Sequence, residues 1–477
     1  MTDVCIVGAG AGGLAAAAEL SRAGHRVTVL DKGRSYAATE FRLASPTWET
    51  DPLPFEGPEY TSAPPQTLPD RPSLRSHRRG WPLLPAGTRA EAEIVAVRGV
   101  GGGTLRYQAV ARRLPVPWAP TDEYEGMERA LGVTRHALSY ASRHVKQAFD
   151  RLRLSLEPAP AAILAKPEGG RRACTYCAGC TYGCTIGAKS SADLAFLPRA
   201  RDIGLITGAS AHRLERQGRV TAVLYHDREG REHRIEAEAF VLAAGALETP
   251  RLLQLSGFEA GRGVMESLHV SLTLLSEEPL GSYRGVPIDA LCEDFERPQG
   301  FVIGVSQSAV GLLGPVSYAK RLAPVDREGH AAFMKKYFGN AIGLYASAGQ
   351  ASRAENRIAL DSRKDRFGLP LPRIESRLDA ADLNLLETLR ERLLEIAAEV
   401  PNAKVVEQFS SYDLPPGGTE LRGSSAGLVD ETGRVKDVPN LYVADASLFP
   451  TAGSGNPSLT IMALATRVAR RIGERHR

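Results

Sequence analysis

The sequence of 477 residues has no apolar run of the roughly 18–20 residues that a helix needs to cross a bilayer. It also has no large excess of one charge. The formal net charge is +4, which over this length does not indicate binding to nucleic acid or to an anionic membrane. No signal peptide is apparent, since Asp3 leads directly into the apolar residues 4–7. These absences predict a chain with no membrane span and no nucleic-acid partner. We expect it in the cytoplasm, unless it is exported on a partner's signal.

Cysteine is scarce outside one segment. Cys5 and Cys292 are isolated and are typical of buried small apolar side chains. The other four of the six cysteines fall within eleven residues, as Cys174, Cys177, Cys180 and Cys184. In a reducing compartment such a cluster indicates metal or redox chemistry before disulfides. No Cys-x-x-Cys-His motif occurs, so any haem relay would belong to another chain.

The amino-terminal segment has the order expected of a dinucleotide site. A short apolar strand over 4–7 is followed by a glycine turn, a helix over 14–23 and a second strand over 25–30. Glycines at such a turn let the backbone approach a pyrophosphate at the helix N-terminus. The residues expected to do this are Gly8, Gly10 and Gly13. Asp31, at the end of the second strand, is placed to accept the ribose hydroxyls.

Further segments resemble the glucose–methanol–choline (GMC) family of FAD oxidoreductases and occur in the family's order. They are residues 98–104, 245–253, 356–370, 440–450 and 456–460. The resemblance implies that the nucleotide is FAD. It also implies that Gly102, Gly103 and Thr104 lie against the flavin, and that Asp445, Asn456 and Pro457 belong to the closing signature. Pro457 begins a helix over 459–472, and in the family the positive end of this helix points at the flavin pyrimidine.

The fold implied by the resemblance is α/β (α+β overall). A Rossmann-like FAD-binding domain is assembled from discontinuous segments, and a substrate domain contains an antiparallel sheet backed by helices. We expect the first domain over 1–110, 165–265 and 425–477, and the second over 111–164 and 266–424. Within the second, residues 301–305 are compatible with a strand, and the amphipathic stretch 382–400 predicts a helix across the sheet.

The spacing of the four cysteines is typical of an iron–sulfur site. A zinc site fits less well, because structural zinc sites usually pair two separated knuckles. The sequence here is similar to the gluconate 2-dehydrogenase and FAD-glucose dehydrogenase branch of the GMC family. That similarity implies a [3Fe-4S] cluster on Cys174, Cys180 and Cys184, with Cys177 as a spare. A [4Fe-4S] cluster on all four is the second choice, and a loop without metal stays open.

The catalytic pattern of the family is incomplete. The resemblance implies a histidine base just before Gly417-Gly418-Thr419, but Leu414 or Pro415 stands there, and neither side chain can accept a proton. Asn456 matches the second catalytic position. Asp413 or Tyr412 is then the candidate replacement, or the substrate needs no strong base. His269 falls where this branch often has polar residues near the substrate, although a lone histidine is more often structural.

These observations predict an FAD-dependent dehydrogenase, rather than an oxidase, that oxidises a polar or hydroxylated small molecule. Electrons would pass through the iron–sulfur cluster to an external acceptor, which can be a partner protein. Two alternatives stay open. One is a divergent flavoenzyme performing desaturation, amine or C–H oxidation, or redox-neutral chemistry. The other is a non-catalytic electron-transfer subunit.

Overall fold

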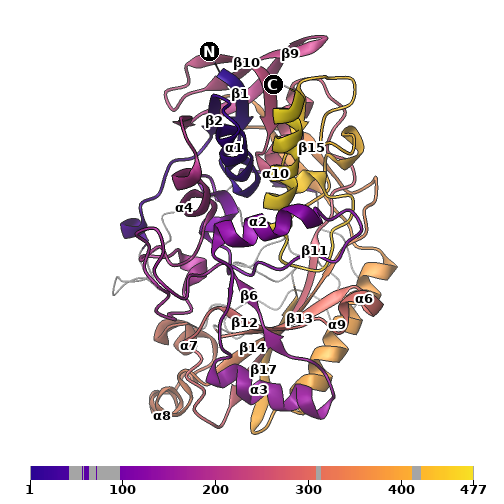
Figure 1. The fold of residues 1–477 in the computed structure, drawn as a ribbon. Coiled ribbons are helices and arrows are strands. Elements are labelled where there is room, and N and C mark those ends of the chain that lie inside the picture. The colour runs from indigo at the N-terminus through magenta and orange to yellow at the C-terminus, as the bar shows by residue number, and fades with distance from the viewer. Residues whose placement is uncertain are drawn as a thin grey trace.

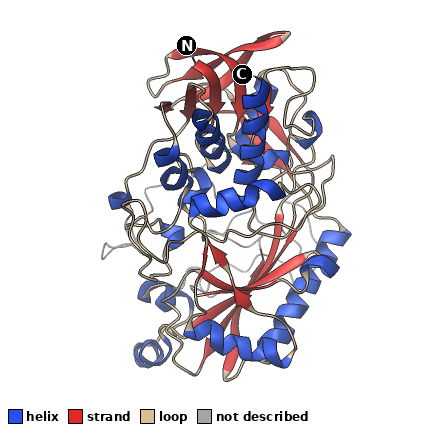
Figure 2. Ribbon diagram, in the orientation of Figure 1, coloured by secondary structure: helices blue, strands red, loops and turns tan. Residues whose placement is uncertain are grey.

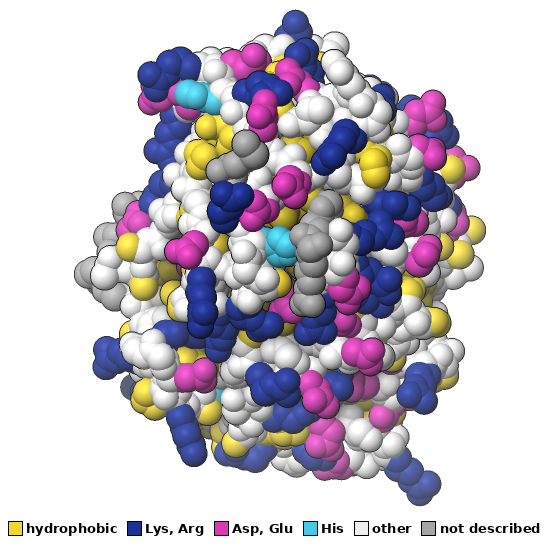
Figure 3. Space-filling view, turned by 45° about the horizontal axis from the view of Figure 1, so that its top comes forward, with side chains coloured by type: hydrophobic (Ala, Val, Ile, Leu, Met, Phe, Trp, Pro, Cys, Tyr) yellow, Lys and Arg dark blue, Asp and Glu magenta, His cyan; other side chains and the backbone are white. Residues whose placement is uncertain are grey.

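The computed structural model describes residues 2–41, 56, 59–63, 71, 97–307, 313–410 and 421–475. Two sheets lie at opposite ends of the elongated molecule (Figure 1, Figure 2). The amino-terminal strands and the two chain ends lie at the upper end, and the second sheet lies at the lower end. On the face shown in Figure 3, Lys and Arg side chains are interspersed with Asp and Glu, in keeping with the small net charge.

The upper sheet contains the predicted nucleotide-binding unit. β1 (Thr2–Val7) pairs in parallel with β2 (Val27–Asp31) and with β10 (Glu232–Leu242). β7 (Ile203–Thr207) extends the sheet beside β2, and β18 (Leu441–Val443) pairs in parallel with β10. The apolar residues of β1, β2, β18 and the carboxyl half of β10 are buried, as expected when a parallel sheet has both faces covered, whereas those of the edge strand β7 are half-buried.

β10 takes part in two kinds of pairing. Its carboxyl half lies parallel to β1 and β18, whereas its amino half pairs antiparallel with β9 (Arg219–His226). β9 in turn pairs antiparallel with β8 (Ser210–Gln217). The resulting three-stranded meander projects from the upper end of the molecule (Figure 1).

The predicted first helix is α1 (Ala11–Arg22), which begins three residues before the expected start because Gly10 serves as its N-cap. α1 packs against α10 (Ser458–Arg475) and shares its core with α2 (Thr121–Leu131). Four consecutive buried alanines of α1, residues 15–18, allow close approach of its neighbours. The last helix of the chain therefore covers the first.

The lower sheet is antiparallel, which confirms the prediction. Among the described residues its order is β17 (Ala403–Ser410), β11 (Ser267–Ser276), β14 (Ala341–Gly349), β13 (Phe301–Ser306), β12 (Ile288–Cys292) and β5 (Glu157–Pro158). One face packs on α9 (Ala380–Ala398) and α3 (Tyr140–Arg151) in a single apolar core. The predicted strand over 301–305 and the helix over 382–400 correspond to β13 and α9.

Smaller elements connect these layers. β15 (Arg357–Lys364) and β16 (Pro370–Glu375) form a hairpin beside α5 (Gly245–Leu255), and β3 (Thr61–Ser62) adds to its edge. The others are β4 (Thr134–Arg135), β6 (Pro160–Ala161), α4 (Ala192–Phe196), α6 (Glu296–Gln299), α7 (Pro315–Arg321) and α8 (Arg327–Tyr337).

The segment 111–164, which the sequence assigns to the substrate domain, contributes to both cores. α2 packs with α1 and α10, and α3 packs with α9. The domain boundaries themselves stay a prediction. Within the described part of the chain, every helix is too short or too polar to traverse a bilayer.

Candidate active site

A cavity of about 310 Å³ lies at the carboxyl ends of β1, β2 and β10. Its walls include the glycine turn after β1, Asp31 and Lys32, and residues 243–248 after β10. Ligands of open parallel sheets bind at this edge. The N-terminus of α1 opens on the same cavity, and no side chain caps it. Its first amides are therefore suited to an anionic group such as a pyrophosphate.

Two glycine loops meet at this cavity. Gly102 has a φ of 52°, and a Cβ there would lie 2.8 Å from Gly10 Cα. Gly8, Gly10, Gly102 and Gly103 all line the cavity. Gly13 does not, but it packs so closely that a Cβ would lie 1.8 Å from the Gly8 carbonyl oxygen. Bare backbone thus forms this part of the wall, which fits a large, flat nucleotide cofactor.

The Asp31 carboxylate lines the cavity and also holds the glycine turn in place. Its Oδ2 accepts from the Ala9 amide at 2.8 Å, and its Oδ1 accepts from the Gly33 amide at 2.8 Å. Burial raises the pKa of this carboxyl. An ionised carboxylate offers about four acceptor positions, so two amide contacts leave room for ribose hydroxyls. The role of Asp31 toward a ribose stays a prediction.

Asp445 joins the closing signature to the segment after β10. This buried carboxylate accepts from Thr249 Oγ1 at 2.6 Å, from the Gly245 amide at 2.8 Å and from the Ser447 amide at 2.9 Å. Burial raises its pKa. Asp445 lines the cavity, and its hydrogen bonds also fix the backbone around it, so part of its role is structural.

Thr104 has a structural task beside its predicted one. Its hydroxyl donates to the Gly101 carbonyl at 2.5 Å and accepts from the Ala192 amide at 2.8 Å. These bonds tie the second glycine loop to the start of α4. The neighbouring Gly102 and Gly103 line the cavity, as do Arg98 and Gly99 at the start of this loop.

Asn456 and Pro457 lie at the start of α10, as predicted. Asn456 has a left-handed backbone with a φ of 38°, and its Oδ1 is buried without a hydrogen-bond partner among the described residues. Non-glycine residues in this conformation are uncommon and gather at functional sites. A buried acceptor without a partner is likewise unusual, and it fits a ligand that donates a hydrogen bond here.

The face of the lower sheet opposite α9 carries polar residues, arranged in rows across the strands. His269 of β11 stands opposite Ser347 of β14, which stands opposite Val302 of β13. Ser347 Oγ would lie 3.1 Å from a Cβ on Gly455. The row that contains His269 therefore reaches the loop that ends in Asn456.

The two predicted replacement bases, Tyr412 and Asp413, lie outside the described residues, as do Leu414 and Pro415. Their place in the site stays a prediction. His269 is half-buried and is placed by the sheet register.

The four cysteines line one small enclosed cavity of about 30 Å³. Cys180 is buried, Cys174 and Cys184 are half-buried, and Cys177 is exposed. Burial raises the pKa of the Cys180 thiol above its ordinary range. Two residues of this loop, Tyr176 and Ala178, have positive φ values of 56° and 53°. Such strain is tolerated where surrounding contacts fix the backbone.

Lys189 connects the cysteine loop to the second glycine loop. Its buried ammonium donates to the Cys180 carbonyl at 2.6 Å and to the Leu105 carbonyl at 2.8 Å. Its own amide donates to Cys184 Sγ at 3.4 Å. Burial lowers the pKa of Lys189 to about 8. The cysteine loop therefore packs directly behind the loop that carries Gly102 and Gly103.

Two family models for GMC oxidoreductases match this chain, one over residues 124–273 and one over 352–465. Together they cover more than half of the sequence. The chain belongs to the GMC oxidoreductase family. A Rossmann-like NAD(P)-binding model also matches residues 6–45, which is the unit built from β1, α1 and β2. Family membership identifies the protein as an FAD-dependent oxidoreductase.

Known proteins are similar to this chain over 71–99% of its length. The chain is 28% identical to 6'''-hydroxyparomomycin C oxidase of Streptomyces lividus, covering 98% of this chain and 91% of that protein. It is 25% identical to the fructose dehydrogenase large subunit of Gluconobacter japonicus, covering 71% and 66%. Among solved structures, pyridoxine 4-oxidase from Mesorbium loti has the same fold, with a TM-score of 0.63 at 16% identity and 99% coverage of both chains.

Sequence reasoning missed two buried arginines of this GMC core. Arg112 donates to the Ser454 carbonyl at 2.7 Å, and Arg422 donates to Ser267 Oγ at 2.8 Å and to the Ala452 carbonyl. Both hold the loop that precedes α10. Arginine is rarely buried unless it is paired, and the pairs are distant in sequence. The only sequence feature that could have indicated either arginine is the position of Arg422 shortly after Gly417-Gly418-Thr419.

Proposed function

We propose that this chain is an FAD-dependent dehydrogenase that oxidises a polar, hydroxylated small molecule and passes the electrons through an iron–sulfur cluster to an external acceptor. The observation that carries the proposal is the gathering of four cysteines around one cavity, directly behind the second glycine loop. Bound FAD supplies the hydride acceptor. A cluster behind the flavin loop gives electrons a short route toward the outside.

We assign the parts of FAD to the predicted residues as follows. The pyrophosphate binds at the turn of Gly8, Gly10 and Gly13, where the uncapped amides of α1 favour negative charge. Asp31 accepts the ribose hydroxyls. The flavin ring lies near Gly102, Gly103, Thr104 and Asn456, with Asp445 and Pro457 fixing the surrounding backbone.

The exposure of the cysteines favours a [3Fe-4S] cluster on Cys174, Cys180 and Cys184, because Cys177 is the exposed one. A [4Fe-4S] cluster on all four is the second choice. A single zinc ion fits less well. Thiolates bound to one tetrahedral ion at about 2.3 Å lie within about 4 Å of one another. Among the described residues, the one group of three such donor atoms within 4.8 Å contains no cysteine.

The substrate class rests on the relatives and on the polar sheet face. The names of two relatives refer to hydroxyparomomycin C and to fructose, and we extend that hydroxylated class to this chain. Ser306 and Ser347 on the polar face have buried hydroxyls without hydrogen-bond partners among the described residues. Substrate hydroxyl groups are suitable partners for them.

For the proton of the substrate hydroxyl we propose His269 as the acceptor, with Asn456 orienting the substrate through its amide. General-base catalysis of this kind typically contributes 10²–10⁴-fold. Asp413 and Tyr412 are the competing candidates. His269 is preferred because its row on the lower sheet leads to Gly455 and Asn456.

The cluster is tested on protein purified without oxygen. Visible and electron paramagnetic resonance spectra are recorded together with iron and sulfide assays. We expect about three irons for each chain and a paramagnetic signal in the oxidised protein, whereas an oxidised four-iron cluster is silent. Absence of both iron and sulfide would remove the electron relay from the proposal and leave the flavoenzyme.

One observation favours a second candidate function. Because Leu414 or Pro415 stands where the family base is expected, the chain can instead catalyse an oxidation that needs no strong base, such as that of an amine. Anaerobic mixing with alcohols and with amines distinguishes the two by which class bleaches the flavin. If neither class does so while dithionite reduces both flavin and cluster, the chain is an electron-transfer subunit.

A further inference from the structure

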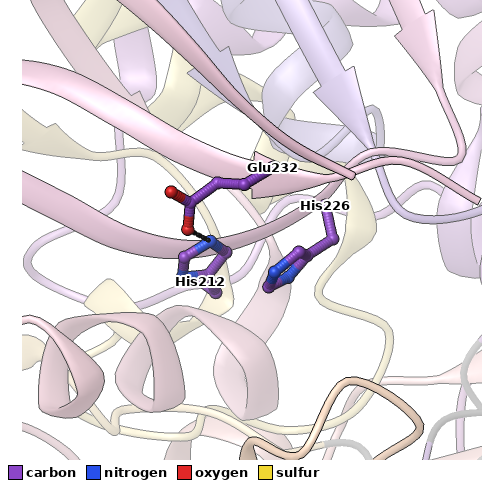
Figure 4. Close-up of side chains that lie close together, drawn as sticks. All are labelled: His212, His226 and Glu232. Carbon is purple, nitrogen blue, oxygen red and sulfur yellow. Dashed lines mark ion pairs between the residues drawn. The ribbon is translucent and has the colours of Figure 1, made fainter. Parts of the chain in front are cut away.

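Three potential metal ligands converge on the meander at the upper end of the molecule, away from the cysteine loop. His212, His226 and Glu232 come from β8, β9 and β10 respectively (Figure 4). Glu232 stands directly opposite His226 in the β9–β10 pairing. The register of β8 against β9 shifts between Ala211 and Arg213, so that His212 is the extra residue of a bulge. Bulges re-aim side chains, and this one brings His212 to the other two.

The donor atoms are close enough to share one ion. One donor atom from each of the three side chains lies within 4.8 Å of the others. His212 Nε2 lies 3.1 Å from a Glu232 carboxylate oxygen. Two donors bound tetrahedrally to one zinc ion at about 2.1 Å lie about 3.4 Å apart, which is close to the separation of this pair.

Packing alone leaves these side chains incompletely satisfied. His212 is 8% exposed and His226 is half-buried. His212 Nε2 has the Glu232 carboxylate as its one polar contact among the described residues, and the buried His226 Nδ1 forms no hydrogen bond with them. The imidazoles stack with centroids 4.3 Å apart, and Phe367 stacks on the other side of His226 at 4.9 Å. Buried ring nitrogens normally have partners, and a metal ion would supply one.

We propose that His212, His226 and Glu232 bind one divalent transition-metal ion, with Zn²⁺ as the best match. Two imidazoles and one carboxylate form a known zinc ligand set that leaves a coordination position for water. Binding requires the His226 ring to turn out of its stack so that its nitrogen points at the ion. The ion would bridge three neighbouring strands.

The site has a consequence for the nucleotide cavity. Ser210 and Ala211, which immediately precede His212, line that cavity. An ion that fixes the bulge therefore also fixes this part of the cavity wall. We expect the metal to raise the melting temperature of the protein independently of its activity.

The test uses Co²⁺ as a spectroscopic probe on the full-length protein. Nitrogen and oxygen ligands give weak visible d–d bands, whereas cysteine thiolates add intense near-ultraviolet charge-transfer bands, so the cysteine loop is distinguished from the histidine site. We expect one equivalent of Co²⁺ with d–d bands and no accompanying thiolate bands, and displacement of that equivalent by Zn²⁺. Absence of such an equivalent would overturn the proposal.

Glu232→Gln and His226→Gln should each weaken binding of this equivalent at least tenfold. The control is Glu229→Gln, in the same hairpin, whose carboxylate is 65% exposed and pairs with Arg231. It should bind Co²⁺ as the wild type does. Zn²⁺ should raise the melting temperature of the wild type and of the control, but not that of Glu232→Gln. Equal binding by all three variants would also refute the assignment.

Discussion

At the scale of single residues, the polar atoms around the closing loop are incompletely paired. Asn456 Oδ1, Ser306 Oγ and Ser347 Oγ are buried and form no hydrogen bond with the described residues. Buried polar groups without partners are costly, at about 1–3 kcal/mol each. Their presence on one face of the sheet and on the facing loop is consistent with a polar substrate that binds between them.

His269→Gln should lower the rate of flavin reduction by substrate about 10²–10⁴-fold, because glutamine retains a hydrogen bond but cannot take the proton. Substrate affinity should change little. The measurement is anaerobic stopped-flow absorbance of the flavin over a range of substrate concentrations. His233→Gln is a suitable control, since His233 lies on the exposed half of β10.

The competing bases are separated by the same assay. Asp413→Asn and Tyr412→Phe should retain most of the rate if His269 is the acceptor. A large loss in either variant, with little loss in His269→Gln, would transfer the role to that residue.

Gly102→Ala should lower the FAD content of the purified protein. The residue has a positive φ, and the new methyl group would meet Gly10 Cα at 2.8 Å. Left-handed backbone costs a non-glycine residue about 1–2 kcal/mol, so FAD affinity should fall about tenfold. The ratio of flavin to protein absorbance after dialysis measures this. Gly126→Ala in α2 should keep its FAD, since nothing lies within 4 Å of its added Cβ.

At the scale of elements, a buried ion pair holds the β15–β16 hairpin to α5. Arg251 Nη2 lies 2.6 Å from the Asp365 carboxylate, and their side chains are 4% and 1% exposed. Burial raises the pKa of Asp365, but the Arg251 guanidinium and the amides of Phe367 and Leu369 outweigh it and bring the pKa below the ordinary 3.8.

Asp365→Asn should lower the free energy of unfolding by about 2 kcal/mol, the usual size for a hydrogen bond to a charged group. Because the folded pKa is depressed, this stability is present above pH 3.8 and is lost as the pH falls through the folded pKa. Urea unfolding at several pH values should show a constant difference from wild type above about pH 5 and a smaller one below pH 3.8. Asp150→Asn, which removes an exposed pair with Lys146, should change stability by less than about 0.5 kcal/mol.

The elements that depend on local signals were predictable from the sequence. β1, α1 and β2 follow from an apolar strand, a glycine turn and an alanine-rich helix, and their observed bounds differ from expectation by three residues or fewer. Helix α9 follows from its amphipathic period. The register of β11 against β14 was not predictable, because it is set by contacts between residues about seventy positions apart.

The residues of the candidate site were likewise predictable only where a local sequence motif brings them together. Gly8, Gly10 and Asp31 lie on one cavity because their motif is local. The cysteines likewise share one cavity because they share one loop. Other parts of the site depend on how distant segments pack, and no sequence periodicity reveals them. They are the row from His269 to Gly455 and the buried arginines, Arg112 and Arg422, that hold the loop before α10. The bulge that places His212 is of the same kind, since it exists only in the pairing with β9.

At the scale of the whole molecule, the cysteine loop and the flavin cavity should work as one relay. Cys180→Ser should retain FAD and substrate-dependent flavin bleaching but lose iron and sulfide, and reduction of an artificial one-electron acceptor should slow markedly. Cys177→Ser should keep about three irons for each chain if the triad holds the cluster. Iron analysis and electron paramagnetic resonance check both variants, and loss of the cluster in Cys177→Ser would indicate a four-iron site instead.

The pairing of β10 with both β1 and β18, and the packing of α10 on α1, also set an order of events during synthesis. The first strand leaves the ribosome long before its partner at residues 232–242, and β18 follows only at residues 441–443. Until α10 emerges, the alanine face of α1 lacks its cover. The amino-terminal unit therefore completes its sheet and its helix packing only after β18 and α10 have been synthesised, and we expect FAD to be captured after that point.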